Sequence, residues 1–353
     1  MKAIAKTKSG VGLDLINIPD PTPEPDEVVL KVLQCGIDGP ADTGFYEWGP
    51  EAEMMMGPLL PIVIGHEILG EVVSNGAEAR LFQPGTRVVL EPTISCGRCG
   101  FCLEGKQNIC SSVAGLIGIT RNGGMAEYLA VPQRVLIEVP DVLSDEEAVV
   151  LEPMGVAVHA LEHAPVNVGD PVVVIGAGFV GLMLLQLLKL SGASPVIVVG
   201  TQHSLPRLEI AKALKADLTL ISGKDDVTAR VMEATEGLGA KVVFEAAGKA
   251  QAIQQGIDVL RSGGRMCLLG STRSKVEIQP LNILLKEAEI VTSRARRLAN
   301  WHRAIKLACA RQINLEPFHS RVVPLEGAVE LIGKITEDRS IVHAAVNPWK
   351  KHK

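Results

Sequence analysis

The sequence is poor in aromatic residues, because Phe, Trp and Tyr together make up 3% of its 353 residues. It also contains no uninterrupted apolar run that approaches the ~18 residues a membrane-spanning helix needs. Residues 1–15 lack the apolar core and the small-residue cleavage site of a signal peptide. We therefore expect a cytoplasmic protein with no membrane partner.

Excess positive charge is missing as well. The chain carries 35 Lys and Arg residues against 40 Asp and Glu residues, which gives a formal net charge of −5. Such a balance provides no global positive field to attract nucleic acid or an anionic membrane, and we expect neither as a partner. The hydrophobic content of 47% is ordinary for a globular enzyme, and the length allows two domains.

The chain changes character twice along its length. Residues 1–154 contain short β-like runs broken by Gly and Pro, which predict a β-rich domain. Residues 155–294 alternate short Val/Ile/Leu-rich runs with helical stretches, a pattern typical of a parallel sheet covered by helices on both faces. Residues 295–353 return to mixed helix and strand, and could either form a third unit or rejoin the first domain.

Four of the seven cysteines crowd into one short stretch, with the spacing Cys96-x2-Cys99-x2-Cys102-x7-Cys110. Four thiolates at this spacing can close a tetrahedron around zinc and leave no open position, which predicts a structural site. Disulfides are a poor alternative in a cytoplasmic enzyme. A zinc ribbon for nucleic acid is possible from this motif alone, but the acidic chain argues against it.

A glycine-rich turn follows the strand expected at residues 171–175 and opens a helical pattern. In such a turn Gly176 permits the tight bend, Gly178 lets the backbone approach a pyrophosphate, and Gly181 allows close packing of helix and strand. The free N–H groups of the helix then face the phosphates. The predicted cofactor-binding residues of this turn are Gly176, Gly178, Phe179, Val180 and Gly181.

The end of the next predicted strand lacks the acidic residue that binds the adenosine ribose of NAD. Gly200 stands at that place and is followed by Thr201 and His203, whose side chains could bind a 2′-phosphate. Arg207 could assist, or could be an ordinary residue of a helix surface. We therefore favour NADP as the cofactor, with NAD possible.

Taken together, these motifs resemble the zinc-containing medium-chain dehydrogenases, particularly the sorbitol, threonine and sugar dehydrogenase branches. The resemblance implies a GroES-like catalytic domain over residues 1–154, completed by residues 295–353, around a doubly wound Rossmann domain over residues 155–294. It also implies a structural zinc lobe near residues 91–115 and a homotetramer or homodimer. The motifs that carry the resemblance are Gly65-His66-Glu67, 85–92, the four-cysteine lobe, 123–132, 151–160 and 176–181.

The resemblance further implies a second, catalytic zinc ion. In the family a cysteine within a G-[IV]-C-G-[ST]-D stretch supplies the first ligand, but here Asp38 stands at that place and Cys35 lies three positions earlier. A carboxylate is a competent zinc ligand, and some sugar dehydrogenases of the family make the same substitution. The expected catalytic and metal-binding residues are Asp38, His66, Glu67 and Glu152.

The family's usual proton relay is absent, because Pro40 replaces its Ser or Thr. Thr43, Tyr46 or a water held by Glu67 could substitute, and the sequence does not choose among them. Three aromatic residues after the first ligand could wall the substrate pocket or pack in the core: Phe45, Tyr46 and Trp48.

These inferences predict a zinc-dependent oxidoreductase that transfers hydride between NAD(P) and a secondary hydroxyl of a polyol, sugar or related alcohol. One alternative is a zinc-stabilised binding or regulatory module without turnover, suggested by the changes at positions 38 and 40. Another is a metal-free enone reductase, although such relatives generally lack the cysteine lobe and the Gly-His-Glu motif.

Overall fold

The computed structural model describes residues 1–351 apart from 273, 320, 336 and 339, with residues 40 and 51 described by their backbone only. The chain divides into two compact units. The first unit contains residues 1–152, 297–310 and 318–353, and the second contains residues 153–296 and 311–317. The C-terminal segment is thus shared between the units, and most of it completes the first.

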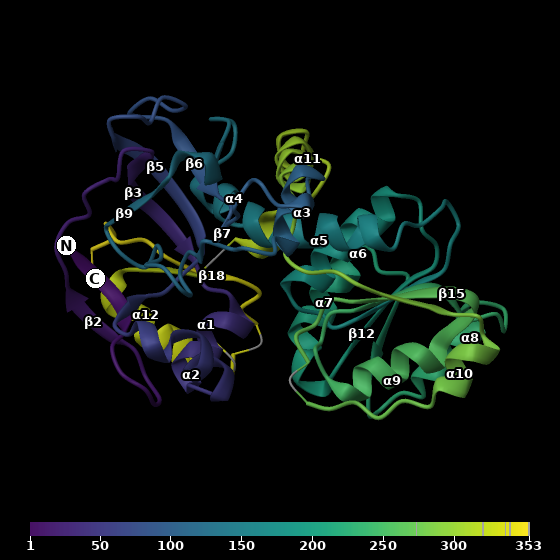
Figure 1. Cartoon of the computed structure of the whole chain (residues 1–353). Coiled ribbons are helices and arrows are strands. Elements are labelled where there is room, and N and C mark those ends of the chain that lie inside the picture. Colours follow the sequence, from purple (N-terminus) through teal and green to yellow (C-terminus); the bar gives the residue numbers. More distant parts are fainter. Residues whose placement is uncertain (273, 320, 336, 339, 352–353) are drawn as a thin grey trace. The chain divides into compact units, whose positions relative to one another are not determined.

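The main sheet of the first unit joins strands from both ends of the chain, in the order β10-β6-β5-β3-β18-β17, with β9 also paired to β3 (Figure 1). The central strand β3 is buried at almost every position, as expected of a strand covered on both faces. The bounds are β3 Glu27–Gly36, β5 Glu67–Asn75, β6 Arg87–Leu90, β9 Tyr128–Pro132, β10 Leu136–Glu138, β17 Arg321–Val323 and β18 Ala344–Val346.

Smaller sheets and short helices complete the first unit. Helix α12 buries Leu325, Ala328, Leu331 and Ile332, one apolar face at helical spacing, in the core of this unit. The small sheets have the orders β2-β1-β4 and β7-β8. The remaining bounds are β1 Lys2–Lys6, β2 Asp14–Asn17, β4 Ile62–Val63, β7 Thr93–Ile94, β8 Gly115–Leu116, α1 Gly39–Glu47, α2 Pro50–Met56, α3 Gly100–Leu103, α4 Asp145–Val149, α11 Leu298–Cys309 and α12 Leu325–Lys334.

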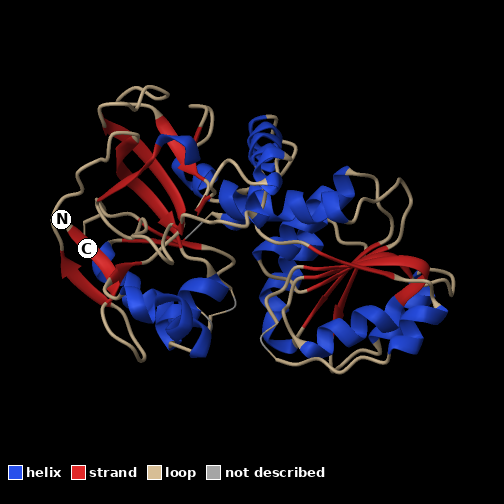
Figure 2. Cartoon of the chain, in the orientation of Figure 1, coloured by secondary structure: helices blue, strands red, loops and turns tan. Residues whose placement is uncertain are grey.

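The second unit is built on a parallel sheet with the order β13-β12-β11-β14-β15-β16. Figure 2 shows helices on both faces of this sheet, with the strands fanned by the usual twist. All four residues of β11 are buried, which explains its unbroken Val/Ile composition. The strand bounds are β11 Val172–Ile175, β12 Val196–Gly200, β13 Leu218–Ile221, β14 Ala240–Glu245, β15 Leu260–Leu268 and β16 Glu289–Thr292.

The strand order of this sheet reverses between β11 and β14, and in doubly wound folds ligands bind beside the carboxyl ends of the strands at such a point. The architecture confirms the predicted doubly wound α/β unit. Among the described residues, no helix combines the length and the apolar character that crossing a membrane requires. The helix bounds are α5 Leu151–His163, which begins in the last residues of the first unit, α6 Phe179–Leu190, α7 Leu205–Ala213, α8 Val227–Ala234, α9 Ala250–Val259 and α10 Pro280–Leu285.

Candidate metal centres and dinucleotide site

The four clustered cysteines converge in the loop around α3. Their sulfur atoms are separated by 4.0 Å (Cys96 to Cys102), 3.5 Å (Cys99 to Cys102) and 3.9 Å (Cys99 to Cys110). A tetrahedral zinc ion with Zn–S bonds near 2.3 Å places its sulfur ligands about 3.8 Å apart. The geometry of the lobe therefore fits a closed tetrathiolate site.

Backbone N–H groups also point at these sulfur atoms. The N–H groups of Cys96 and Ser112 approach the sulfur of Cys110 at 3.4 Å, and that of Cys99 approaches the sulfur of Cys96 at 3.4 Å. Hydrogen bonds from the backbone of Cys102 and of the following loop lower the pKa of the Cys99 thiol to about 5. The backbone thus favours thiolate at Cys99, the form that binds metal, whereas burial raises the pKa of the Cys102 thiol to about 11.

The second cluster lies at the start of β5 in the first unit. Nε2 of His66 lies 3.4 Å from Oδ2 of Asp38 and 3.9 Å from Oε1 of Glu152. The ligand atoms of Asp38, His66 and Glu67 all lie within 4.8 Å of one another. A tetrahedral ion with bonds near 2.1 Å to nitrogen and oxygen separates its ligands by about 3.4 Å. Glu152 lies at the edge of this cluster.

Negative charge dominates this cluster, which is largely buried. Burial opposes the protonation of His66, but the hydrogen bond with Asp38 and the charges of Glu152, Asp38 and Asp42 outweigh it and raise the pKa of His66 to about 10. For Asp42, burial disfavours the charged carboxylate and raises the pKa to about 8. In the metal-free chain the protonation of His66 and Asp42 offsets part of this negative charge, and a bound cation would offset it in place of those protons. The donor set therefore fits a metal ion.

Local chain geometry explains the orientation of Asp38. This residue is the N-cap of α1, where its Oδ1 accepts a hydrogen bond of 3.1 Å from the N–H of Ala41. Oδ1 thus caps the helix while Oδ2 faces His66. The backbone N–H of Asp38 donates in return to Oδ2 of Asp42, at 3.0 Å.

Two residues of this neighbourhood were not identified from the sequence. Asp42 is fully buried beside the cluster, and its spacing of four residues from Asp38 is the sequence signal that could have revealed it. His343 donates from Nε2 to Oε2 of Glu67 at 2.6 Å. No local signal pointed to His343, because it lies 276 residues away along the chain.

The structure places two of the three substitutes considered for the proton relay, Thr43 and Tyr46, among other partners. The hydroxyl of Thr43 donates to the carbonyl oxygen of Gly39 within α1. Tyr46 packs against the core of the first unit, with its hydroxyl beside Gly333 of α12. Phe45 is part of the same core, so packing rather than a pocket wall describes both aromatic residues. The side chain of residue 40 lies outside the described part of the structure.

The glycine-rich turn of the second unit has the geometry that its motif predicts. Gly176 adopts a φ of +114°, which favours glycine. A Cβ atom on Gly181 would lie 1.9 Å from the carbonyl oxygen of Gly176, whereas one on Gly178 would meet nothing within 4 Å. Gly178 is the N-cap of α6, whose first residues are Phe179 and Val180. The open side of the turn leaves room for a phosphate group at the helix N-terminus.

The candidate 2′-phosphate site lies at the end of β12. Thr201 is exposed, and its hydroxyl lies 3.2 Å from that of Ser204. Arg207 follows in the first turn of α7. Gly200 is buried, and a Cβ atom there would lie 3.1 Å from the side chain of Leu208. A side chain at position 201 is therefore exposed to solvent at this edge, whereas one at position 200 would point into the packing around Leu208.

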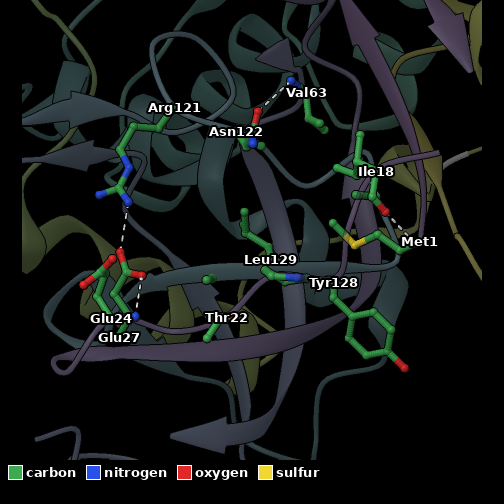
Figure 3. Close-up of a pocket in the computed structure, with 14 residues that line it drawn as sticks. Met1, Ile18, Thr22, Glu24, Glu27, Val63, Arg121, Asn122, Tyr128 and Leu129 are labelled. Carbon is green, nitrogen blue, oxygen red and sulfur yellow. Dashed lines mark hydrogen bonds and ion pairs between the residues drawn. The ribbon is translucent and has the colours of Figure 1, made fainter. Parts of the chain in front are cut away.

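A separate cavity of about 290 Å³ lies in the first unit, and its lining residues include Met1, Glu27 and Tyr128 (Figure 3). Arg121 and Glu27 form an ion pair of 2.9 Å at its wall. None of the candidate metal ligands lines this cavity. It is therefore distinct from both metal centres.

Comparison with known proteins identifies the family of the chain. Residues 24–141 match the family model of the alcohol dehydrogenase GroES-like domain, and residues 180–310 match that of the zinc-binding dehydrogenases. The chain is 35% identical over 319 residues to an L-threonine 3-dehydrogenase of Pyrococcus horikoshii, covering 90% of each protein. It is also 35% identical over 318 residues to a sorbitol dehydrogenase of Halalkalibacterium halodurans, covering 89% of this chain and 90% of that protein.

A solved structure shows the same relationship in three dimensions. The 2R,3R-butanediol dehydrogenase of Bacillus subtilis superposes with a TM-score of 0.87 at 28% identity, covering 98% of this chain and 99% of that chain. These similarities extend over both units and confirm the resemblance found in the motifs. The chain therefore belongs to the zinc-dependent medium-chain dehydrogenase family.

Proposed function

We propose that the protein transfers hydride between NAD(P) and a secondary hydroxyl of a polyol, sugar or related alcohol, with a zinc ion held by Asp38, His66 and Glu67. The convergence of these ligand atoms within 4.8 Å in a buried, negatively charged site carries the proposal. Relatives named as sorbitol, threonine and butanediol dehydrogenases support a substrate with a secondary hydroxyl. A turnover screen over polyols and sugars with NAD and NADP tests it, and absence of turnover would favour a non-catalytic module.

In this mechanism the residues hold the substrate oxygen close to a positive charge. When bound, the metal would act as a Lewis acid toward the substrate oxygen, and the nicotinamide would be the hydride carrier. Asp38, His66 and Glu67 would hold the ion, and Glu152 would add negative charge 3.9 Å from His66. Because the hydroxyl of Thr43 bonds within α1 and that of Tyr46 packs beside Gly333, we infer that a water held by Glu67 would take the proton.

We further propose a second zinc ion, bound by Cys96, Cys99, Cys102 and Cys110, whose role is structural. Replacing Cys99 by serine is expected to remove one zinc ion per chain and to lower the melting temperature, because a structural ion contributes its binding free energy to folding. Metal-ligating thiolates persist in a reducing compartment, which supports the cytoplasm as the location.

Elemental analysis and thermal unfolding measure this effect. The matched control is Cys309→Ser, which alters a half-buried cysteine of α11 outside the lobe and should keep both ions. Equal zinc content and melting temperature for Cys99→Ser and wild type would contradict a structural site in the lobe.

We propose that NADP is the preferred cofactor and that the end of β12 determines this preference. The expected contacts of the 2′-phosphate are the hydroxyls of Thr201 and Ser204 and the guanidinium of Arg207. The exposed hydroxyl pair, 3.2 Å apart, and the absence of a carboxylate at Gly200 support this assignment. The turn residues Gly176, Gly178, Phe179, Val180 and Gly181 would bind the pyrophosphate.

Replacing Thr201 by aspartate is expected to shift the preference toward NAD roughly ten- to hundredfold, because like charges would repel the 2′-phosphate. The ratio of kcat/KM with NAD to that with NADP measures the shift. Thr201→Asn is the neutral control and should change the ratio far less. A wild-type enzyme that prefers NAD would overturn the cofactor assignment.

We propose that the protein assembles as a homotetramer, with a homodimer as the second possibility. Strand β16 is the edge of its sheet in the described residues. The adjacent helix α10 exposes Leu281, Leu284 and Leu285, which a second copy could cover. Light scattering of the intact protein measures the number of chains, and a monomer would contradict the proposal.

A further inference from the structure

One buried histidine beside the metal cluster has no part in the mechanism described above. His343 precedes β18, and its side chain and that of Glu67 are each only 3% exposed. Its Nε2 lies 2.6 Å from Oε2 of Glu67. We infer that His343 is a positioning residue that orients Glu67 toward the catalytic metal.

Strand pairing brings these two residues together. Strand β3 lies between β18 and β5, and Gly36 of β3 pairs with Ala345 on one side and with Glu67 on the other. A Cβ atom on Gly36 would lie 2.1 Å from Oε2 of Glu67 and 2.9 Å from Nε2 of His343. The missing side chain at Gly36 therefore leaves the space in which His343 reaches across β3 to Glu67.

The chemistry of the pair restricts what Glu67 can do. A carboxylate only accepts hydrogen bonds, so Nε2 of His343 carries the proton and donates it. Because Oε2 is engaged in this short, buried hydrogen bond, the carboxylate is held in one orientation and its other oxygen is left for the metal. Partners of this kind that orient a metal ligand typically contribute about 10- to 100-fold to metal affinity or activity. The inference rests on the proposed catalytic metal site.

The test compares three variants of the whole chain, in which the side chains at position 343 differ in length and in their ability to donate a hydrogen bond. His343→Gln can place its amide nitrogen near the position of Nε2, His343→Asn is too short, and His343→Ala removes the donor. Cobalt affinity of the non-cysteine site, measured by chelator competition, should fall roughly 10- to 100-fold in the Asn and Ala variants. It should return to near wild type in the Gln variant. The visible absorption of bound cobalt reports the change in ligand geometry independently of turnover.

The ion pair of Arg121 with Glu27 provides a matched control (Figure 3). Glu27 is also a buried glutamate of the first unit, only 4% exposed, although its partner Arg121 is exposed. Arg121→Gln therefore weakens the ion pair of a buried glutamate that includes no candidate metal ligand. We expect this variant to lose stability while keeping the cobalt affinity and spectrum of the wild type.

Two further outcomes separate this inference from the proposed function. If His343→Asn and His343→Ala lose stability but keep wild-type cobalt affinity and absorption, His343 is only structural and the inference is wrong. If the wild type itself binds no metal outside the cysteine lobe, the proposed catalytic site is wrong and the inference falls with it.

Discussion

Replacing Asp38 by alanine is expected to remove one of two zinc ions per chain and to reduce hydride transfer roughly a thousandfold or more. The loss follows because a bound Lewis acid stabilises the reacting oxygen by several kcal/mol, and each 1.4 kcal/mol of barrier is tenfold in rate. The change removes the Oδ2 atom that faces His66 at 3.4 Å. Elemental analysis and steady-state kinetics measure the two effects.

Asparagine at position 38 separates the two roles of this residue. Asp38→Asn keeps an oxygen that can accept from the N–H of Ala41, whereas alanine loses the helix cap and about 1 kcal/mol of stability. Both variants lose the anionic ligand and the negative charge beside His66, so both should lose metal and turnover. Alanine should lower the stability of the metal-free protein further than asparagine, because only alanine also loses the helix cap. A fully active, metal-replete Asp38→Ala protein would contradict the assignment of Asp38.

Alanine at Gly178 or Gly181 is expected to abolish tight cofactor binding by two different routes. At Gly181 the new Cβ atom would lie 1.9 Å from a backbone oxygen, so α6 must move away from the turn, at a cost of about 1–3 kcal/mol in stability as well as binding. At Gly178 the new Cβ atom meets no protein atom, and the backbone φ of −81° suits alanine. There the methyl group only blocks the approach of the pyrophosphate.

Cofactor titration by fluorescence and denaturant unfolding distinguish these routes. Gly181→Ala should lose both cofactor affinity and stability, whereas Gly178→Ala should lose cofactor affinity alone. Each 1.4 kcal/mol of lost binding free energy lowers the affinity roughly tenfold. Wild-type affinity of Gly178→Ala for both NAD and NADP would show that the phosphates bind elsewhere.

Motifs that depend on neighbours in the chain could be predicted from the sequence. The four cysteines span only Cys96 to Cys110, and their spacing alone brings their sulfur atoms to within bonding distance of one ion. The turn from Gly176 to Gly181 likewise joins a strand directly to a helix, so each glycine's role follows from its position. The alternation of strands and helices indicated the parallel sheet of the second unit in the same way.

The sequence by itself thus determined the family, the fold class and the candidate ligands Asp38, His66 and Glu67. Only the tertiary structure decided what surrounds them, because strand pairing and side-chain direction depend on contacts between distant segments. The pairing of β18 with β3 brings His343 to Glu67 across 276 residues of chain, and packing against α12 draws Tyr46 into the core. A local pattern records spacing along the chain, and it carries no information on which distant strand will become a neighbour.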